Sequence, residues 1–101
     1  MKAFLHVSFR LKSPRGDILP LVEGRFDKAS DWIRYAPNCW LLYTSHSPQT
    51  WFARLMRIPG IKSHEFLICE VNLNNRGGYL DEAVWAWVDK YTGNRDAAAS
   101  D

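Results

Sequence analysis

Two stretches of this sequence, residues 3–11 and 66–73, alternate with a period of two residues, which is the pattern of a β-strand. Successive side chains of a strand point to opposite faces of its sheet. In the first stretch one face receives only apolar residues: Ala3, Leu5, Val7, Phe9 and Leu11. The other face receives Phe4, His6, Ser8 and Arg10. We therefore expect a strand that is buried on one side.

The second alternating stretch also divides into two faces. Leu67, Cys69, Val71 and Leu73 share one face, and Phe66, Ile68, Glu70 and Asn72 share the other. We expect the Phe66 face to lie beside Phe4 and His6, on the side of the sheet that the helices leave uncovered.

Two helices and a hairpin are expected between these strands. Ile18, Val22 and Phe26 form a helical stripe behind a capping Asp17. Aromatic runs at 30–36 and 39–45, separated by Pro37 and Asn38, predict a hairpin with a type I turn and a bulge.

Ser47 followed by Pro48 predicts the start of the second helix, and Pro59-Gly60 predicts its end. The residues expected on its core side are Trp51, Phe52, Leu55 and Met56. A last helix is expected over about 79–92, with a stripe formed by Leu80, Val84, Trp87, Val88 and Tyr91.

The element order β-α-β-β-α-β predicts an α+β, ferredoxin-like fold with a four-stranded antiparallel sheet and helices on one face, plus a C-terminal helix. Right-handed crossovers place the strands in the order 4-1-3-2. We expect one domain over residues 1–92 and a flexible tail over 93–101, because 101 residues suffice for one core.

Charge and cysteine content restrict the function only loosely. Residues 1–62 carry ten Lys/Arg and four Asp/Glu, about +6, whereas residues 63–101 carry three and seven, about −4. This uneven distribution of charge can steer a polyanion or pair two copies head to tail. Alternatively, the charged residues simply lie on solvated surface. Two isolated cysteines and no long apolar run favour a cytoplasmic protein with reduced thiols and no membrane contact.

The sheet face without helices is too apolar for plain solvent surface. Three interpretations remain open: an interface between two copies, an aromatic platform for single-stranded RNA, or a face covered by the last helix. The residues expected at a dimer interface are Phe4, His6, Ser8, Phe66 and Ile68.

Signals for catalysis are weak. The three histidines, His6, His46 and His64, are far apart in sequence, and Ser47 beside His46 is better explained as a helix cap. No metal-ligand spacing and no glycine-rich phosphate loop occurs, so we expect neither a metal nor a cofactor and assign no catalytic residue. Phosphate contacts are expected from Lys12, Arg15, Arg54 and Arg57, unless these residues only solvate the surface.

Two segments resemble a known family. The runs FLHVSFRL (4–11) and WIRYAPNCWLLYTS (32–45) resemble the SinR/VapD-like proteins, which are similar to the CRISPR-associated ribonuclease of the spacer-acquisition complex. The resemblance covers about residues 3–73 and rests mostly on hydrophobic patterning. It implies a ferredoxin-like homodimer linked to RNA cleavage, nucleic-acid binding or toxin–antitoxin systems.

One departure from that family changes the expected activity. Nuclease members carry a metal-binding acidic residue late in the first strand, where this sequence has Arg10. An arginine cannot ligate Mg²⁺. We therefore expect Arg10 to bind phosphate or to pair with a carboxylate such as Glu70.

The sequence thus predicts a small non-catalytic homodimer that acts as a nucleic-acid-associated or interaction module of toxin–antitoxin or defence type. Two alternatives stay open. One is a divergent, metal-independent ribonuclease that uses His6 or His46 with a nearby arginine, and the other is an accessory protein that binds a protein partner through exposed aromatic residues.

Overall fold

The structure is a computed structural model that describes residues 1–12 and 18–92. Arg15, the capping Asp17 and the tail 93–101 lie outside the described residues. The chain divides into two compact units, Met1–Val71 and a second unit that begins at Asn72. The single domain expected over 1–92 stays a prediction.

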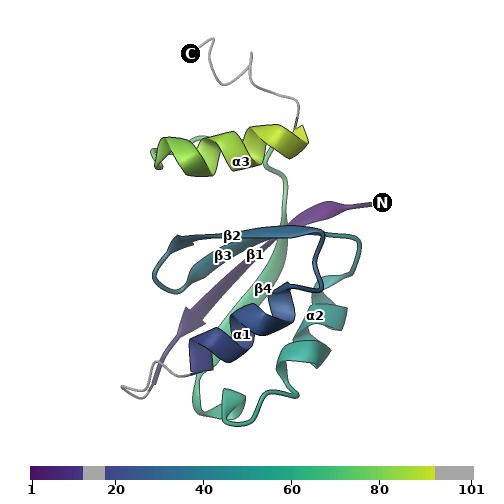
Figure 1. Cartoon of the computed structure of the whole chain (residues 1–101), viewed down its shortest axis with the longest axis vertical. Coiled ribbons are helices and arrows are strands. Elements are labelled where there is room, and N and C mark those ends of the chain that lie inside the picture. The colour runs from purple at the N-terminus through teal and green to yellow at the C-terminus, as the bar shows by residue number, and fades with distance from the viewer. Residues whose placement is uncertain (13–17, 93–101) are drawn as a thin grey trace. The chain divides into compact units, whose positions relative to one another are not determined.

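The first unit is α+β, with one four-stranded antiparallel sheet and two helices (Figure 1). In chain order its elements are β1 (Ala3–Arg10), α1 (Ile18–Phe26), β2 (Asp31–Ala36), β3 (Cys39–Thr44), α2 (Pro48–Leu55), the 3₁₀ turn η1 (Ile61–Ser63) and β4 (Glu65–Val71). The strands lie in the order β2-β3-β1-β4. Read from the β4 edge, this is the order that the sequence predicts.

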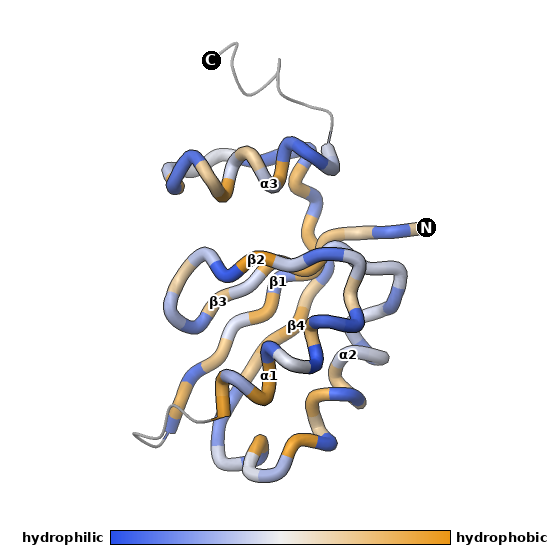
Figure 2. The backbone as a smooth tube through the Cα atoms, viewed as in Figure 1, coloured by the Kyte–Doolittle hydropathy of each residue, from blue (hydrophilic) through white to orange (hydrophobic). Residues whose placement is uncertain are grey.

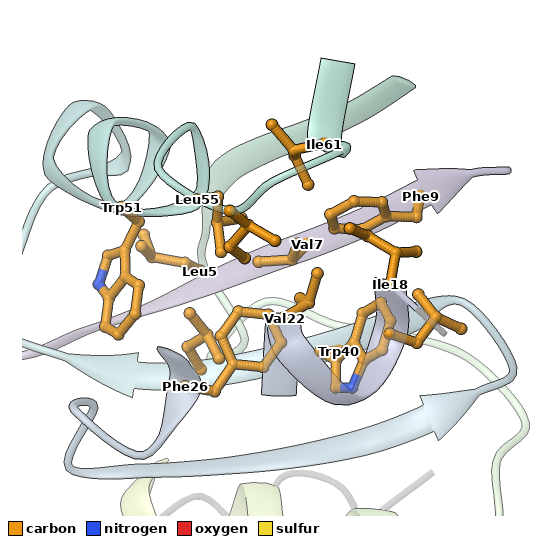
Figure 3. Packing of buried hydrophobic residues seen from close by; sticks show 13 residues of the cluster. Leu5, Val7, Phe9, Ile18, Val22, Phe26, Trp40, Trp51, Leu55 and Ile61 are labelled. Carbon is orange, nitrogen blue, oxygen red and sulfur yellow. The ribbon is translucent and has the colours of Figure 1, made fainter. Parts of the chain in front are cut away.

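One hydrophobic core fills the space between the sheet and the two helices (Figure 3). Its fully buried aromatic side chains are Phe26, Trp40 and Trp51. Both indole N–H groups have partners: Trp51 Nε1 donates to Thr44 Oγ1 at 3.1 Å, and Trp40 Nε1 donates to Glu23 Oε2 at 2.8 Å. These bonds remove the cost of burying an unpaired donor.

The start of α2 confirms the sequence prediction, whereas its end does not. The Ser47 hydroxyl accepts a hydrogen bond from the Thr50 backbone N–H at 3.2 Å. The helix ends at Leu55, before Pro59, and Gly60 then takes a left-handed φ of 86° that leads into η1. Phe52 was expected in the core but is 51% exposed, because the buried stripe of this short helix consists of Trp51 and Leu55.

The face assignment predicted for β4 is wrong. Phe66 and Ile68 lie opposite Phe9 and Val7 of β1, so they point to the helix-covered side and pack against the core. The Phe9 and Phe66 rings stack with centroids 5.0 Å apart. A change of one residue in register moves every side chain of a strand to the other face. Several successive residues of β4 are apolar (Figure 2), so the hydrophobic pattern alone does not fix its faces.

The second unit contains α3 (Glu82–Thr92). Asp81 precedes this helix and caps its first turn, because its carboxylate accepts a hydrogen bond from the Ala83 N–H at 3.0 Å. The Arg76 guanidinium pairs with Asp89 at 2.6 Å and also donates to the Leu73 carbonyl at 2.7 Å. Among the described residues, no helix is both long and apolar enough to cross a bilayer.

From the packing of the core we expect alanine substitutions of two leucines on the helices to differ strongly in their effect on stability. Leu55→Ala removes a side chain that is 0% exposed and should lower the free energy of unfolding by about 2–5 kcal/mol. Leu21→Ala, at a side chain that is 52% exposed, should change it by less than about 0.5 kcal/mol. Urea unfolding of both variants measures the difference, and equal destabilisation would contradict this core.

Candidate functional site

The sheet face opposite α1 and α2, here called the second face, carries the mixed side chains that the sequence predicts there. The strand register assigns it His6 and Ser8 from β1, and it assigns Cys69 of β4 to the position beside His6. Its other members are Phe4, Arg10, Asp31, Ile33, Tyr35, Ala36, Cys39, Leu41, Tyr43, Glu65, Leu67 and Val71. The Phe4 and Tyr43 rings, 5.2 Å apart, confirm that facing residues share one side.

A hydrogen bond on the second face joins a side chain of β1 to one of β2. His6 Nε2 shares a hydrogen bond with the Tyr35 hydroxyl, and the two rings lie 5.6 Å apart. The structure thus links an imidazole and a phenol that are far apart in sequence.

A β-bulge allows Tyr35 to take this position. The register between β2 and β3 shifts between Arg34 and Ala36, so Tyr35 is the extra residue of β2. Arg34 points to the opposite side, where it pairs with Glu23 at 3.6 Å and donates to the Pro37 carbonyl at 2.9 Å. The bulge therefore brings the Tyr35 side chain into contact with His6.

Burial shifts the pKa values of His6 and Tyr35. It lowers the pKa of His6, because a charged imidazolium loses hydration on the sheet. Burial also raises the pKa of Tyr35, and the charge and hydrogen bond of Cys39 raise it further. Both shifts favour a neutral imidazole and a protonated phenol at neutral pH.

A second cluster lies where β1 ends and β4 begins. Lys12 and Arg10 both contact Glu65, at 3.1 and 3.5 Å, and the Lys12 backbone N–H donates to His64 Nδ1 at 3.1 Å. The Lys12 ammonium lowers the pKa of the Glu65 carboxyl, and Arg10 adds to this effect. Arg10 therefore pairs with Glu65 and not with Glu70, because Glu70 lies on the helix-covered side opposite Leu5.

The other predicted phosphate contacts lie elsewhere. The Arg54 guanidinium packs over the Trp51 ring at 4.7 Å, and its Nη1 is buried with no hydrogen-bond partner among the described residues. Arg57 is exposed one turn further along. Arg15 lies outside the described residues. Of the predicted phosphate contacts within residues 1–12 and 18–92, the structure thus brings Arg10 and Lys12 together at Glu65.

Of the residues predicted at a dimer interface, Phe4, His6 and Ser8 lie on the second face, and Phe66 and Ile68 do not. Sequence reasoning missed Leu67, which lies opposite Ser8 and is 60% exposed. It also missed Tyr35 and Cys39. The run of aromatic residues around Pro37 was a signal for a bulged hairpin, but it does not indicate which side chains the bulge brings together.

His46 is exposed after β3, where its backbone N–H donates to Thr44 Oγ1 at 3.2 Å. Within residues 1–12 and 18–92, no group of three or more His, Cys, Asp or Glu could hold a metal ion.

Comparisons with protein-family models, with curated proteins and with solved structures find no match to this chain. The site described above is therefore interpreted from its own geometry.

The lowered pKa of His6 predicts a pH-dependent stability. An unfolded histidine titrates near 6.5, so below this value the unfolded state binds a proton before the folded state does. The free energy of unfolding should therefore fall as the pH drops below 6.5 towards the folded-state pKa. The difference between the wild-type chain and His6→Gln in denaturant titrations isolates this contribution, and a pH-independent difference would contradict it.

Proposed function

We propose that this chain is a non-catalytic ferredoxin-like module that pairs with a second copy of itself through one half of the second face. That half, here called the β4 patch, consists of Ser8, Leu67, Cys69 and Val71. The order βαββαβ and the strand order β2-β3-β1-β4 support the ferredoxin-like assignment. The single observation that carries the pairing is the exposure of Leu67 in the middle of this patch.

The β4 patch differs from the other exposed apolar positions of the first unit. Leu21 and Phe52 are exposed on helices, where single apolar residues among polar ones are ordinary. Leu67 instead lies on an edge strand, between Cys69 and Glu65 along one face. A two-fold axis brings the same patch of two copies together, so a continuous apolar strip is the feature that such pairing needs.

The proposal keeps the resemblance to SinR/VapD-like proteins as a hypothesis about ancestry, together with the toxin–antitoxin or defence role that this family implies. A cytoplasmic location is part of the proposal and is supported by two free thiols, Cys39 and Cys69. The ribonuclease alternative stays a hypothesis. RNA cleavage that is lost in both His6→Ala and His46→Ala would favour it over a non-catalytic module.

Self-association predicts different effects at two exposed leucines. Leu67→Lys places a charge in the patch and should convert a dimer to a monomer, since an unpaired charge is costly to bury. Leu21→Lys, at a side chain of similar exposure on α1, should leave the mass unchanged. Sedimentation equilibrium measures both. A monomeric wild-type chain, or a dimer that persists in Leu67→Lys, would contradict the proposal.

A second candidate function, binding to nucleic acid, is favoured by the cluster at the end of β1. Arg10 and Lys12 bring two positive charges to one exposed carboxylate, Glu65, so a net positive charge remains there. Exposed ion pairs of this kind are weak. A phosphate group can therefore replace Glu65 as the partner of both cations at little cost.

Salt dependence tests this second function. Each phosphate contact with a single strand contributes roughly 0.7 to the negative slope of log K against log salt concentration. Arg10→Ala/Lys12→Ala should reduce the slope for a single-stranded oligonucleotide by about one unit or more. Arg25→Ala/Lys28→Ala removes the same charge from the α1 side and should change it less.

The substitution Glu65→Gln removes a negative charge from the same cluster and should have the opposite effect on oligonucleotide binding. Removal of the carboxylate frees both cations, so binding of the oligonucleotide should become tighter. Equal slopes for the two double variants, or weaker binding by Glu65→Gln, would contradict a phosphate site at the end of β1.

A further inference from the structure

The backbone of β4 forms a free edge of the sheet. β4 is hydrogen-bonded to β1 alone among the strands, so its other side is open to a further strand. We propose that two copies of this chain join edge to edge, with β4 of one copy antiparallel to β4 of the other, so that the two sheets become one. This inference rests on the proposed self-association and specifies its geometry.

The hydrogen bonds of β1 show which backbone groups of β4 point outward. The Phe9 N–H donates to the Asn38 carbonyl at 2.9 Å, on the β3 side. Backbone groups alternate in direction along an antiparallel strand, so those of His6 point to β4, where they meet Cys69. The residues of β4 whose N–H and C=O groups point away from β1 are therefore Phe66, Ile68 and Glu70.

These outward groups have no partner within the part of the chain that the structure describes. No hydrogen bond joins them to another segment of residues 1–12 and 18–92. The side chains of Phe66 and Ile68 pack against the core, which holds the strand in its extended form. A strand that is already ordered loses little conformational entropy when it pairs.

The two edges of the sheet differ in how open they are to another strand. β2, at the opposite edge, is interrupted by the bulge at Tyr35 and is followed by Pro37. Bulges, prolines and lysines are among the features that protect the edge of a sheet. β4 has none of the three, and all seven of its residues pair with β1 in an unbroken register. The second copy is therefore expected at β4 and not at β2.

The length of β4 fits a two-fold axis at Ile68. The strand has seven residues, and Ile68 is the central one. With the axis there, Phe66 faces Glu70 of the second copy, and each facing pair of outward residues exchanges two backbone hydrogen bonds. Every outward group of the strand then has a partner. A shift of two residues leaves one outward residue of each strand unpaired, so full overlap is the expected register.

The side chains are compatible with this register on both faces. Leu67 lies beside Cys69 of the second copy, so the β4 patches of the two copies form one strip across the axis. A second copy then covers part of the Leu67 side chain, which is 60% exposed in the single chain. Both acidic residues of β4 face an apolar residue of the other copy, so no like charges are opposed.

Amide hydrogen exchange, followed by NMR on the full chain at high and low concentration, tests the edge directly. Sedimentation equilibrium on the same samples gives the fraction of dimer. We expect the amides of Phe66, Ile68 and Glu70 to exchange roughly tenfold more slowly in the dimer, because a hydrogen-bonded amide exchanges only when its bond opens. The amide of Arg34, in the edge strand β2, is the control and should not change.

Two outcomes of this experiment contradict edge pairing and are distinguishable. A dimer in which the outward amides of β4 exchange as fast as in the monomer would overturn the edge geometry and leave self-association through the β4 patch intact. A chain that stays monomeric would overturn both the edge geometry and the proposed function.

A proline at Glu70 removes one outward N–H and keeps the bonds to β1. Proline is tolerated in an edge strand where the missing N–H would face solvent. Glu70→Pro should raise the dissociation constant of the dimer roughly tenfold, since both copies lose a bond. Glu70→Ala keeps the N–H and should leave the constant unchanged. Equal constants would contradict the proposal, and amide exchange of the wild-type chain decides if Glu70→Pro fails to fold.

A cross-link tests the register. In the Cys39→Ser chain, Leu67→Cys places a new thiol beside Cys69 of the second copy, at a closely spaced facing pair where a disulfide can form. Oxidation should yield a covalent dimer on a non-reducing gel. The same chain with Cys69→Ser has the new thiol without its partner and should stay uncross-linked. No cross-link in the first chain, or equal cross-linking in both, would contradict an axis at Ile68.

Discussion

The pairing of β1 with a strand on each side is the constraint on which the rest of the first unit depends. β1 lies between β3 and β4, so its alternation decides which side chains of all three strands face the helices. Leu5, Val7 and Phe9 anchor the core, and His6 therefore points to the second face. Every functional interpretation of this chain follows from that division.

Two buried tryptophans on the helix-covered side of the sheet have hydrogen-bond partners for their indole N–H groups. Trp40 and Trp51 are fully buried, and each indole N–H reaches an oxygen, on Glu23 and Thr44 respectively. Large aromatic side chains contribute most to a core of this size when their polar atoms are paired. Since these residues lie under the helices, the second face carries a mixture of aromatic, aliphatic and polar side chains, among them Phe4, His6 and Leu67.

Much of the first unit could be predicted from sequence, and the exceptions have physical causes. The alternation of β1 and the Ser47 cap each depend on a few neighbouring residues. The face of β4 could not be predicted, because Phe66 and Leu67 are both apolar and only the contact with Phe9 decides between them. Likewise, the contact between Tyr35 and His6 depends on a bulge whose effect appears only when three strands pair.

The central claim is that Leu67 lies on the second face and contacts a second copy of the chain. Isotope-filtered NOE spectroscopy on a mixture of labelled and unlabelled chains detects only contacts between copies. The account predicts such contacts at the Leu67 methyl groups and none at Leu21. Contacts between copies at Leu21 alone, or none at either leucine, would contradict it.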